Sequence, residues 1–277
     1  MIKSMRLRAF SSMLLALLAF TLLVPGAVSA ASVSITQTAQ AALAKHIAAA
    51  PAAMKDKLNA QYSSLQSNQR QENTLDGQYK TLHASNAAAL DAVNKRIKLI
   101  DADKISRLTN ELNATRARYQ PLLTLYTSLN KQIADARKLK LKELTSMLTT
   151  QAELMKPATQ LAREDIRVRE AALKAAKAAT AATVKALKTS LAAITPLHAQ
   201  TKTAQSVVSG AKKSLPDVVK TMNACVKSDS HDGTLQSLTT LVASSKGIID
   251  QKSRIVGYEN QITAIINKVN AQIPSKS

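Results

Sequence analysis

Residues 105–136 read ISRLTNELNATRARYQPLLTLYTSLNKQIADA, and the apolar spacing in this stretch decides the fold class. Steps of three and four residues reach Ile105, Leu108, Leu112, Thr115, Tyr119, Leu122, Tyr126, Leu129, Ile133 and Ala136. All of these except Thr115 and Ala136 are large and apolar. An a/d pattern held over more than about four heptads predicts a coiled-coil seam that packs against another helix. Pro121 lies inside the seam and keeps its phase, which predicts a kink or a tight helix–helix corner.

A second seam occupies the C-terminal part of the chain. Steps of three and four residues reach Leu241, Ser245, Ile248, Lys252, Ile255, Glu259, Ile262, Ile266, Val269 and Ile273. Every second position in the first half of this seam is polar. Polar residues in a seam fix the register and the partner of a helix at some cost in stability. A weaker seam continues the first one towards Pro157 through Leu141, Leu144, Leu148, Gln151 and Met155.

Composition indicates the same fold class. The chain of 277 residues has 6 Gly, 7 Pro and no Trp, so its core must be built from aliphatic side chains, as in helix-on-helix packing. We expect interruptions at Pro51, Asp76-Gly77, Pro121, Pro157, Pro196, Gly210 with Pro216, and residues 228–233. Between them the period is helical, and residues 86–155 could extend on the order of 100 Å at ~1.5 Å per residue.

These observations predict an all-α protein. We expect an elongated antiparallel helical bundle or coiled coil with long helices, in which residues 31–277 form a single region. Residues 1–30 instead predict a signal peptide, because basic residues precede the apolar run 13–24 and Val28-Ser29-Ala30 matches a cleavage site. Cleavage after Ala30 predicts a secreted, extracytoplasmic protein, associated with the cell envelope without a covalent lipid anchor.

The charge is strongly basic and unevenly distributed. The formal net charge is +20, and residues 171–215 contain no Asp or Glu. On a helix of ~3.6 residues per turn, six cations fall within an arc of about 80°; we call them the cationic ridge: Arg163, Arg167, Lys174, Lys177, Lys185 and Lys188. A solvated helix face normally mixes charges of both signs, so the ridge indicates an external anion. Lysines that merely cover neighbouring apolar side chains would give the same pattern.

Export limits the anions that the ridge could meet. Phosphate contacts with DNA fit the charge, but no Phe, Tyr or Trp lies between residues 127 and 257 to stack on bases. We therefore expect an anionic wall polymer or a membrane surface, and not a sequence-specific nucleic acid. Other proteins bound through helix packing, and a second copy of the chain, are further expected partners.

The sequence shows no catalytic motif, and we predict no enzyme activity, no cofactor and no metal site. The histidines are scattered without ligand spacing, so we expect His46 to be an exposed helix residue and His231 to lie in a loop. Residues 228–233, SDSHDG, fail as an EF-hand, because its carboxylate positions would fall on Ser228 and Thr239, and they predict a helix–helix turn instead. Cys225 is interpreted as a small buried hydrophobe, with a reactive or bridging thiol as the alternative.

The function that fits best is a non-enzymatic structural or interaction protein of the cell envelope, held there by charge. Two alternatives stay open: a soluble extracytoplasmic chaperone, or a coiled-coil regulator of a cell-wall enzyme, either of which could use the same electrostatics. A membrane-lytic toxin is disfavoured, because residues 31–277 contain no uninterrupted apolar run near membrane length.

Overall fold

The computed structural model describes residues 35–274, which form six α-helices and contain no β-strand. The helices are α1 (Gln37–Ala49), α2 (Ala52–Lys98), α3 (Ala102–Lys138), α4 (Lys142–Ala192), α5 (Ile194–Lys227) and α6 (His231–Gln272). The predicted all-α bundle with long helices is confirmed. The predicted signal peptide, residues 1–30, lies outside the described residues.

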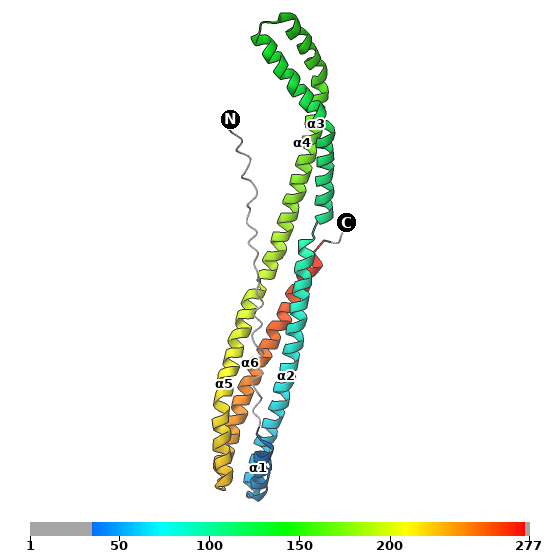
Figure 1. Ribbon diagram of the computed structural model, residues 1–277. Helices are drawn as coiled ribbons and strands as arrows, with labels where there is room; N and C mark the ends of the chain where they lie inside the picture. Colours follow the sequence, from blue (N-terminus) through cyan, green and yellow to red (C-terminus); the bar gives the residue numbers. More distant parts are fainter. Residues whose placement is uncertain (1–34, 275–277) are drawn as a thin grey trace.

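The lower part of the molecule is a three-helix stalk made by α2, α5 and α6, which the end of α4 extends (Figure 1). Helix α6 runs in the same direction as α2. Asn68 donates a hydrogen bond to the carbonyl of Val242 at 3.3 Å, and Asn86, farther along α2, donates one to the carbonyl of Glu259 at 2.9 Å. Helix α5 runs antiparallel to both, because only a short turn joins it to α6.

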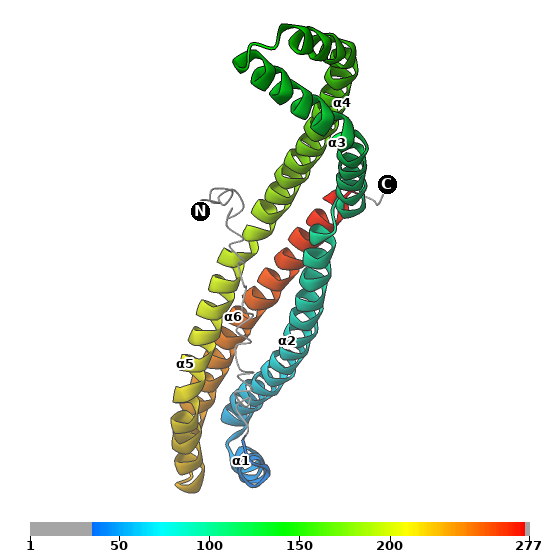
Figure 2. The ribbon, with the colours of Figure 1, turned by 45° about the horizontal axis from the view of Figure 1, so that its top comes forward.

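The upper part is an antiparallel hairpin of α3 and α4 that extends beyond the stalk and bends (Figure 2). Pro121 and Pro157 lie inside these helices. The Arg118–Asp165 ion pair, 3.6 Å long, shows how the two helices align and places the two prolines about one and a half helical turns apart along the hairpin. Because each proline removes a backbone hydrogen bond, we attribute the bend of the hairpin to the two prolines. A helix–helix corner at Pro121 is not formed, since α3 continues through it.

Apolar side chains form three clusters along the rod. One surrounds Met222 at the base of the stalk, one surrounds Ile266 at its upper end, and one surrounds Ile133 in the hairpin. All ten residues of the C-terminal seam are buried, because α6 packs against both α2 and α5. The ten residues of the seam in 105–136 face α4 and are buried or half-buried.

The helix ends differ from the expected interruptions. Asp76-Gly77, Pro121, Pro157 and Gly210 with Pro216 all lie inside helices, so those predictions are wrong. Residues 99–101 and 139–141 interrupt the chain instead, which divides the expected rod at 86–155 among α2, α3 and α4. These turns contain neither Gly nor Pro: Asp101 and Lys140 adopt left-handed backbone conformations, with φ of 54° and 57°.

Residues 228–230 form the α5–α6 turn, as predicted. Ser230 caps α6 by accepting a hydrogen bond from the backbone N–H of Gly233 at 3.3 Å. Glycine is required there, because a Cβ would lie 2.6 Å from the Sγ of half-buried Cys225. Two predictions are wrong at this end: His231 is the first residue of α6, and His46 is 6% exposed because α1 folds back onto the turn.

The turn at 139–141 generates a stability prediction. A non-glycine residue in the left-handed region is strained by roughly 1–2 kcal/mol, and glycine relieves this strain while adding chain entropy to the unfolded state. Lys140→Gly is therefore expected to raise the free energy of unfolding by about 0.5–1 kcal/mol in urea denaturation. Lys138→Gly, in the last turn of α3, is the control and is expected to lower it by about 1 kcal/mol. Equal effects of the two substitutions would contradict the strain argument.

Candidate functional site

The cationic ridge lies on one helix. All six of its residues belong to α4, and all six are exposed. From Arg163 to Lys188 the ridge extends about 38 Å at ~1.5 Å per residue, starting in the hairpin and ending at the upper end of the stalk. The helix is continuous over this length, so the spacing of the cations is fixed by the backbone.

The ridge is only partly neutralised within the chain. Arg167 pairs with Glu164, its Nε donating to Oε2 at 2.7 Å, and this contact lowers the pKa of the exposed Glu164 carboxyl. The guanidinium of Arg163 lies 5.9 Å from the centre of the Tyr126 ring. The other four residues form no ion pair with any described residue: Lys174, Lys177, Lys185 and Lys188. The unpaired charge of the ridge is therefore concentrated in these four lysines.

A second surface of α4 is apolar and exposed. Met147, Leu154, Leu161 and Val168 repeat every seven residues, and each is at least half exposed, with Leu154 at 78%. Exposed leucines of α3, of the turn at 139–141 and of the start of α4 extend this set, and we call the whole the hairpin face: Leu125, Leu139, Leu144, Met147, Leu154, Leu161 and Val168. Several exposed apolar side chains on one flank of a hairpin are a candidate interaction surface.

The Arg118–Asp165 ion pair shows that both helices contribute to the same flank of the hairpin. Leu125 follows Arg118 by seven residues on α3, and Asp165 lies one turn from Leu161 on α4. At ~100° per residue, the hairpin face and the cationic ridge are about 160° apart around α4. One flank of the helix is therefore cationic and the other apolar.

A buried polar layer separates the two apolar clusters of the stalk. Glu72 is fully buried, and its Oε1 accepts hydrogen bonds from the Nζ of Lys252 at 2.9 Å and of Lys212 at 2.6 Å. Lys252 also donates to Asp76 at 2.6 Å. Burial by itself would raise the pKa of Glu72, but the hydrogen bonds and charges of the two ammonium groups lower it overall. The layer therefore contains charges that α2, α5 and α6 must bring together.

A second polar group lies higher in the stalk around Glu259, which is fully buried. Its carboxylate contacts His83 Nδ1 at 2.9 Å and accepts a hydrogen bond from Asn86 Nδ2 at 2.7 Å. Thr263 donates to Asn86 Oδ1 at 2.7 Å. Burial lowers the pKa of nearby His198, against the opposing charge of Glu259. These contacts lie within the bundle, so we assign them a structural role and not the binding of a substrate.

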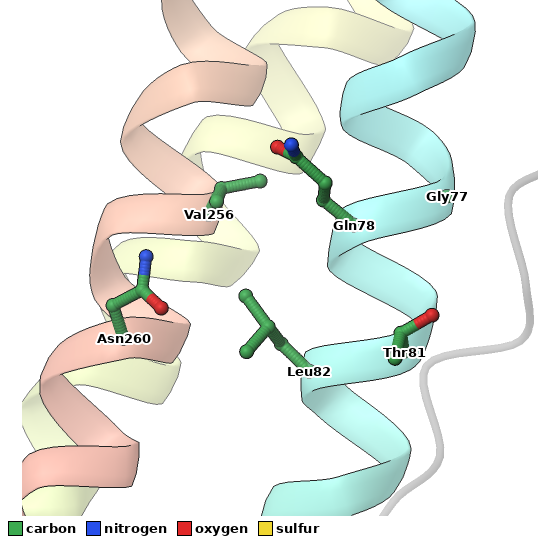
Figure 3. A pocket seen from close by; sticks show the side chains of 6 residues that line it. All are labelled: Gly77, Gln78, Thr81, Leu82, Val256 and Asn260. Carbon is green, nitrogen blue, oxygen red and sulfur yellow. The ribbon is translucent and has the colours of Figure 1, made fainter.

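A shallow hollow between α2 and α6 is lined by Gly77, Gln78, Thr81, Leu82, Val256 and Asn260. Gln78, Leu82, Val256 and Asn260 point into the space between the helices, whereas Thr81 points away from it (Figure 3). None of the six lining residues titrates near neutral pH, so this hollow offers no general acid or base.

Comparison of the chain with protein-family models, with curated proteins and with solved structures gives no match. Within residues 35–274, no helix combines the length and apolar character that a membrane crossing needs. The surfaces of the molecule itself are therefore the basis for inferring its function.

The charge pattern of the sequence predicts the ridge, but the hairpin face is not predicted. The seven-residue repeat from Met147 to Val168 is visible in the sequence. The sequence does not show that this repeat is exposed, because α4 carries apolar residues on two flanks. Only the fold shows which flank α3 covers.

The buried Glu72 generates a pH-dependent stability prediction. Glu72→Gln is expected to lower the free energy of unfolding at neutral pH by about 3 kcal/mol, because two buried ammonium groups lose their carboxylate. Since the folded-state pKa of Glu72 is lowered, its contribution is present above the ordinary value of 4.5 and is lost as the pH falls through the folded value.

Urea denaturation at pH values above 4.5 and below the folded-state pKa of Glu72 measures this loss of stability. The difference in the free energy of unfolding between wild type and Glu72→Gln should shrink on acidification. Glu153→Gln is the matched control: Glu153 is exposed and pairs only with Lys156 among the described residues, so its removal should change stability by less than about 1 kcal/mol. A similar loss in both variants would contradict a special role for the buried carboxylate.

Proposed function

We propose that this protein is an exported, non-enzymatic structural component of the cell envelope, which binds an anionic wall polymer or membrane surface through the cationic ridge. The observation that carries the proposal is a row of four exposed lysines that form no ion pair within residues 35–274: Lys174, Lys177, Lys185 and Lys188. Like charges on one helix face repel, so an external polyanion that neutralises them is favoured.

The shape of the ridge supports a polymer or surface as the ligand. It runs along one continuous helix for about 38 Å, whereas a small anion would need convergent donors in a pocket. Helix α4 itself carries no Phe, Tyr or Trp that could stack on bases, which argues against single-stranded nucleic acid.

The proposed structural role includes self-association, in which two copies of the chain pair through their hairpin faces. From Met147 to Val168 the face is about 30 Å long, and two helices make it about 20 Å wide. Pairing two copies would bury roughly 1,200 Å² in total, which reaches the lower range for specific interfaces. Each hairpin would then lie in a four-helix arrangement, and the ridges would remain outside.

Binding to the anion is tested with a charge variant. The quadruple substitution Lys174→Gln, Lys177→Gln, Lys185→Gln and Lys188→Gln should weaken binding to phosphatidylglycerol vesicles or to polyphosphate at least tenfold, since each lysine contributes up to about 1 kcal/mol. The matched control removes the same charge from exposed lysines elsewhere: Lys55→Gln, Lys57→Gln, Lys104→Gln and Lys131→Gln. Cosedimentation across a salt series measures both.

Equal weakening in the two variants would attribute binding to net charge and overturn the role of the ridge. The two probes separate the ligand classes: a response to polyphosphate alone favours a wall polymer, and a response to vesicles alone favours a membrane surface.

Self-association is tested with Leu154→Gln combined with Leu161→Gln. Wild type should form a dimer in sedimentation equilibrium, and the variant should be monomeric, because two central side chains of the hairpin face become polar. The control, Leu99→Gln with Val207→Gln, changes two exposed apolar residues outside the face and should leave the dimer intact. A monomeric wild type would contradict self-association, and suppression of client aggregation by that monomer would favour a chaperone.

A further inference from the structure

Three side chains that are far apart in the sequence meet at the base of the stalk. His46 lies near the end of α1, Asp229 lies in the α5–α6 turn, and His231 is the first residue of α6. One nitrogen from each ring and one oxygen of the carboxylate all lie within 4.8 Å of one another. His46 Nδ1 is 3.1 Å from Asp229 Oδ1, and His231 Nε2 is 3.9 Å from the same oxygen.

The contacts of His46 allow the tautomer that frees Nδ1 for a metal ion. His46 Nε2 lies 3.1 Å from Thr234 Oγ1, whose hydroxyl donates to the carbonyl of Ser230 at 2.9 Å. With the Thr234 hydrogen on Ser230, Thr234 Oγ1 accepts a hydrogen bond from His46 Nε2. The lone pair of Nδ1 then faces Asp229 Oδ1 at 3.1 Å, where a cation between the two atoms would be favourable.

His231 adds a third donor atom. Its Nε2 is buried and has no hydrogen-bond partner among the described residues. Burying a polar atom without a partner is unfavourable, and such atoms in folded proteins are rare. This nitrogen lies within 4.8 Å of the other two donor atoms, so it is a second indication of a ligand.

We propose that His46 Nδ1, Asp229 Oδ1 and His231 Nε2 form a binding site for a divalent transition-metal ion of the zinc type. Two imidazoles and one carboxylate match the ligands that zinc prefers, whereas calcium takes oxygen ligands. Bonds of about 2.0–2.1 Å in a tetrahedron separate neighbouring ligands by about 3.3–3.4 Å, and the observed 3.1 Å and 3.9 Å bracket that separation. Three protein ligands leave one position for water.

Binding requires a small adjustment of one ring. The rings of His46 and His231 are stacked, with centroids 4.2 Å apart and planes 12° apart. Because an imidazole lone pair lies in the plane of its ring, one ring must turn for both to face a single ion. His231 is half-buried, whereas His46 is held by Thr234, so His231 is the ring that turns.

The metal would join α1 to the α5–α6 turn. Among the described residues, α1 packs chiefly on α2 and α5 and is only 13 residues long. An ion held by α1, the turn and α6 would stabilise the docking of this short helix, as structural metal ions do in small folds.

The experiment is zinc titration of the full chain by isothermal calorimetry at neutral pH, with cobalt(II) absorption as an independent readout. Wild type is expected to bind about one ion per chain and to give the visible bands of tetrahedral cobalt. Asp229→Asn and His231→Ala should each weaken binding at least tenfold. Asp229 is 78% exposed in its side chain, so Asp229→Asn should not impair folding.

Asp232→Asn is the matched control, because it removes the same charge from an exposed position three residues away. It should change zinc affinity by less than about twofold, in contrast with a ligand substitution. Absence of saturable binding by wild type would overturn the proposal and leave a protonated His46–Asp229 ion pair as the explanation of the geometry. Equal effects of Asp229→Asn and Asp232→Asn would overturn it as well.

Discussion

The structure depends on one constraint: an apolar stripe on a long helix must be covered along its whole length. In the stalk, α6 is covered by α2 on one side and α5 on the other, and its ten seam residues are all buried. In the hairpin, α4 packs along its length against one helix, α3. One neighbour covers one flank, so the apolar residues on the other flank stay exposed. The hairpin face therefore follows from a change in the number of helices along the rod.

Covering the stripe does not by itself fix how the helices align. Three apolar helices could slide by a heptad with little change in buried area, and polar seam positions remove that freedom. Lys252 must meet Glu72, and Glu259 must meet Asn86, so a slip of seven residues would leave charges buried without partners. The same pairs also select the parallel orientation of α2 and α6. In an antiparallel arrangement the order of Lys252 and Glu259 along α2 would be reversed, so they could not both meet Glu72 and Asn86. A buried ion pair adds little stability compared with apolar residues of similar volume, although removing one partner is costly. We therefore assign these pairs a role in the alignment of the helices.

Much of the fold could be predicted from the sequence, because helical periodicity is a local signal. The seam of α6 was located position by position, including its polar members. The turns at 99–101 and 139–141 could not be predicted, because Asp101 and Lys140 take left-handed conformations without glycine. Pro121 and Pro157, where interruptions were expected, lie inside helices whose packing keeps them intact. The cluster of His46 and His231 could not be predicted either. Those residues are close only because α1 folds back onto a turn that lies far along the chain.

The two surfaces of α4 have a further physical relation to each other. With a net charge of +20, two copies that approach each other repel, and this opposes pairing through the hairpin face. Because the ridge lies about 160° away around the helix, a polyanion bound there does not compete for the hairpin face and removes part of that repulsion. Linkage then requires the reverse effect: pairing of two chains strengthens their binding to the polyanion by the same factor. In the proposed function, a rod of this design would assemble where the anion is present and stay dispersed where it is absent.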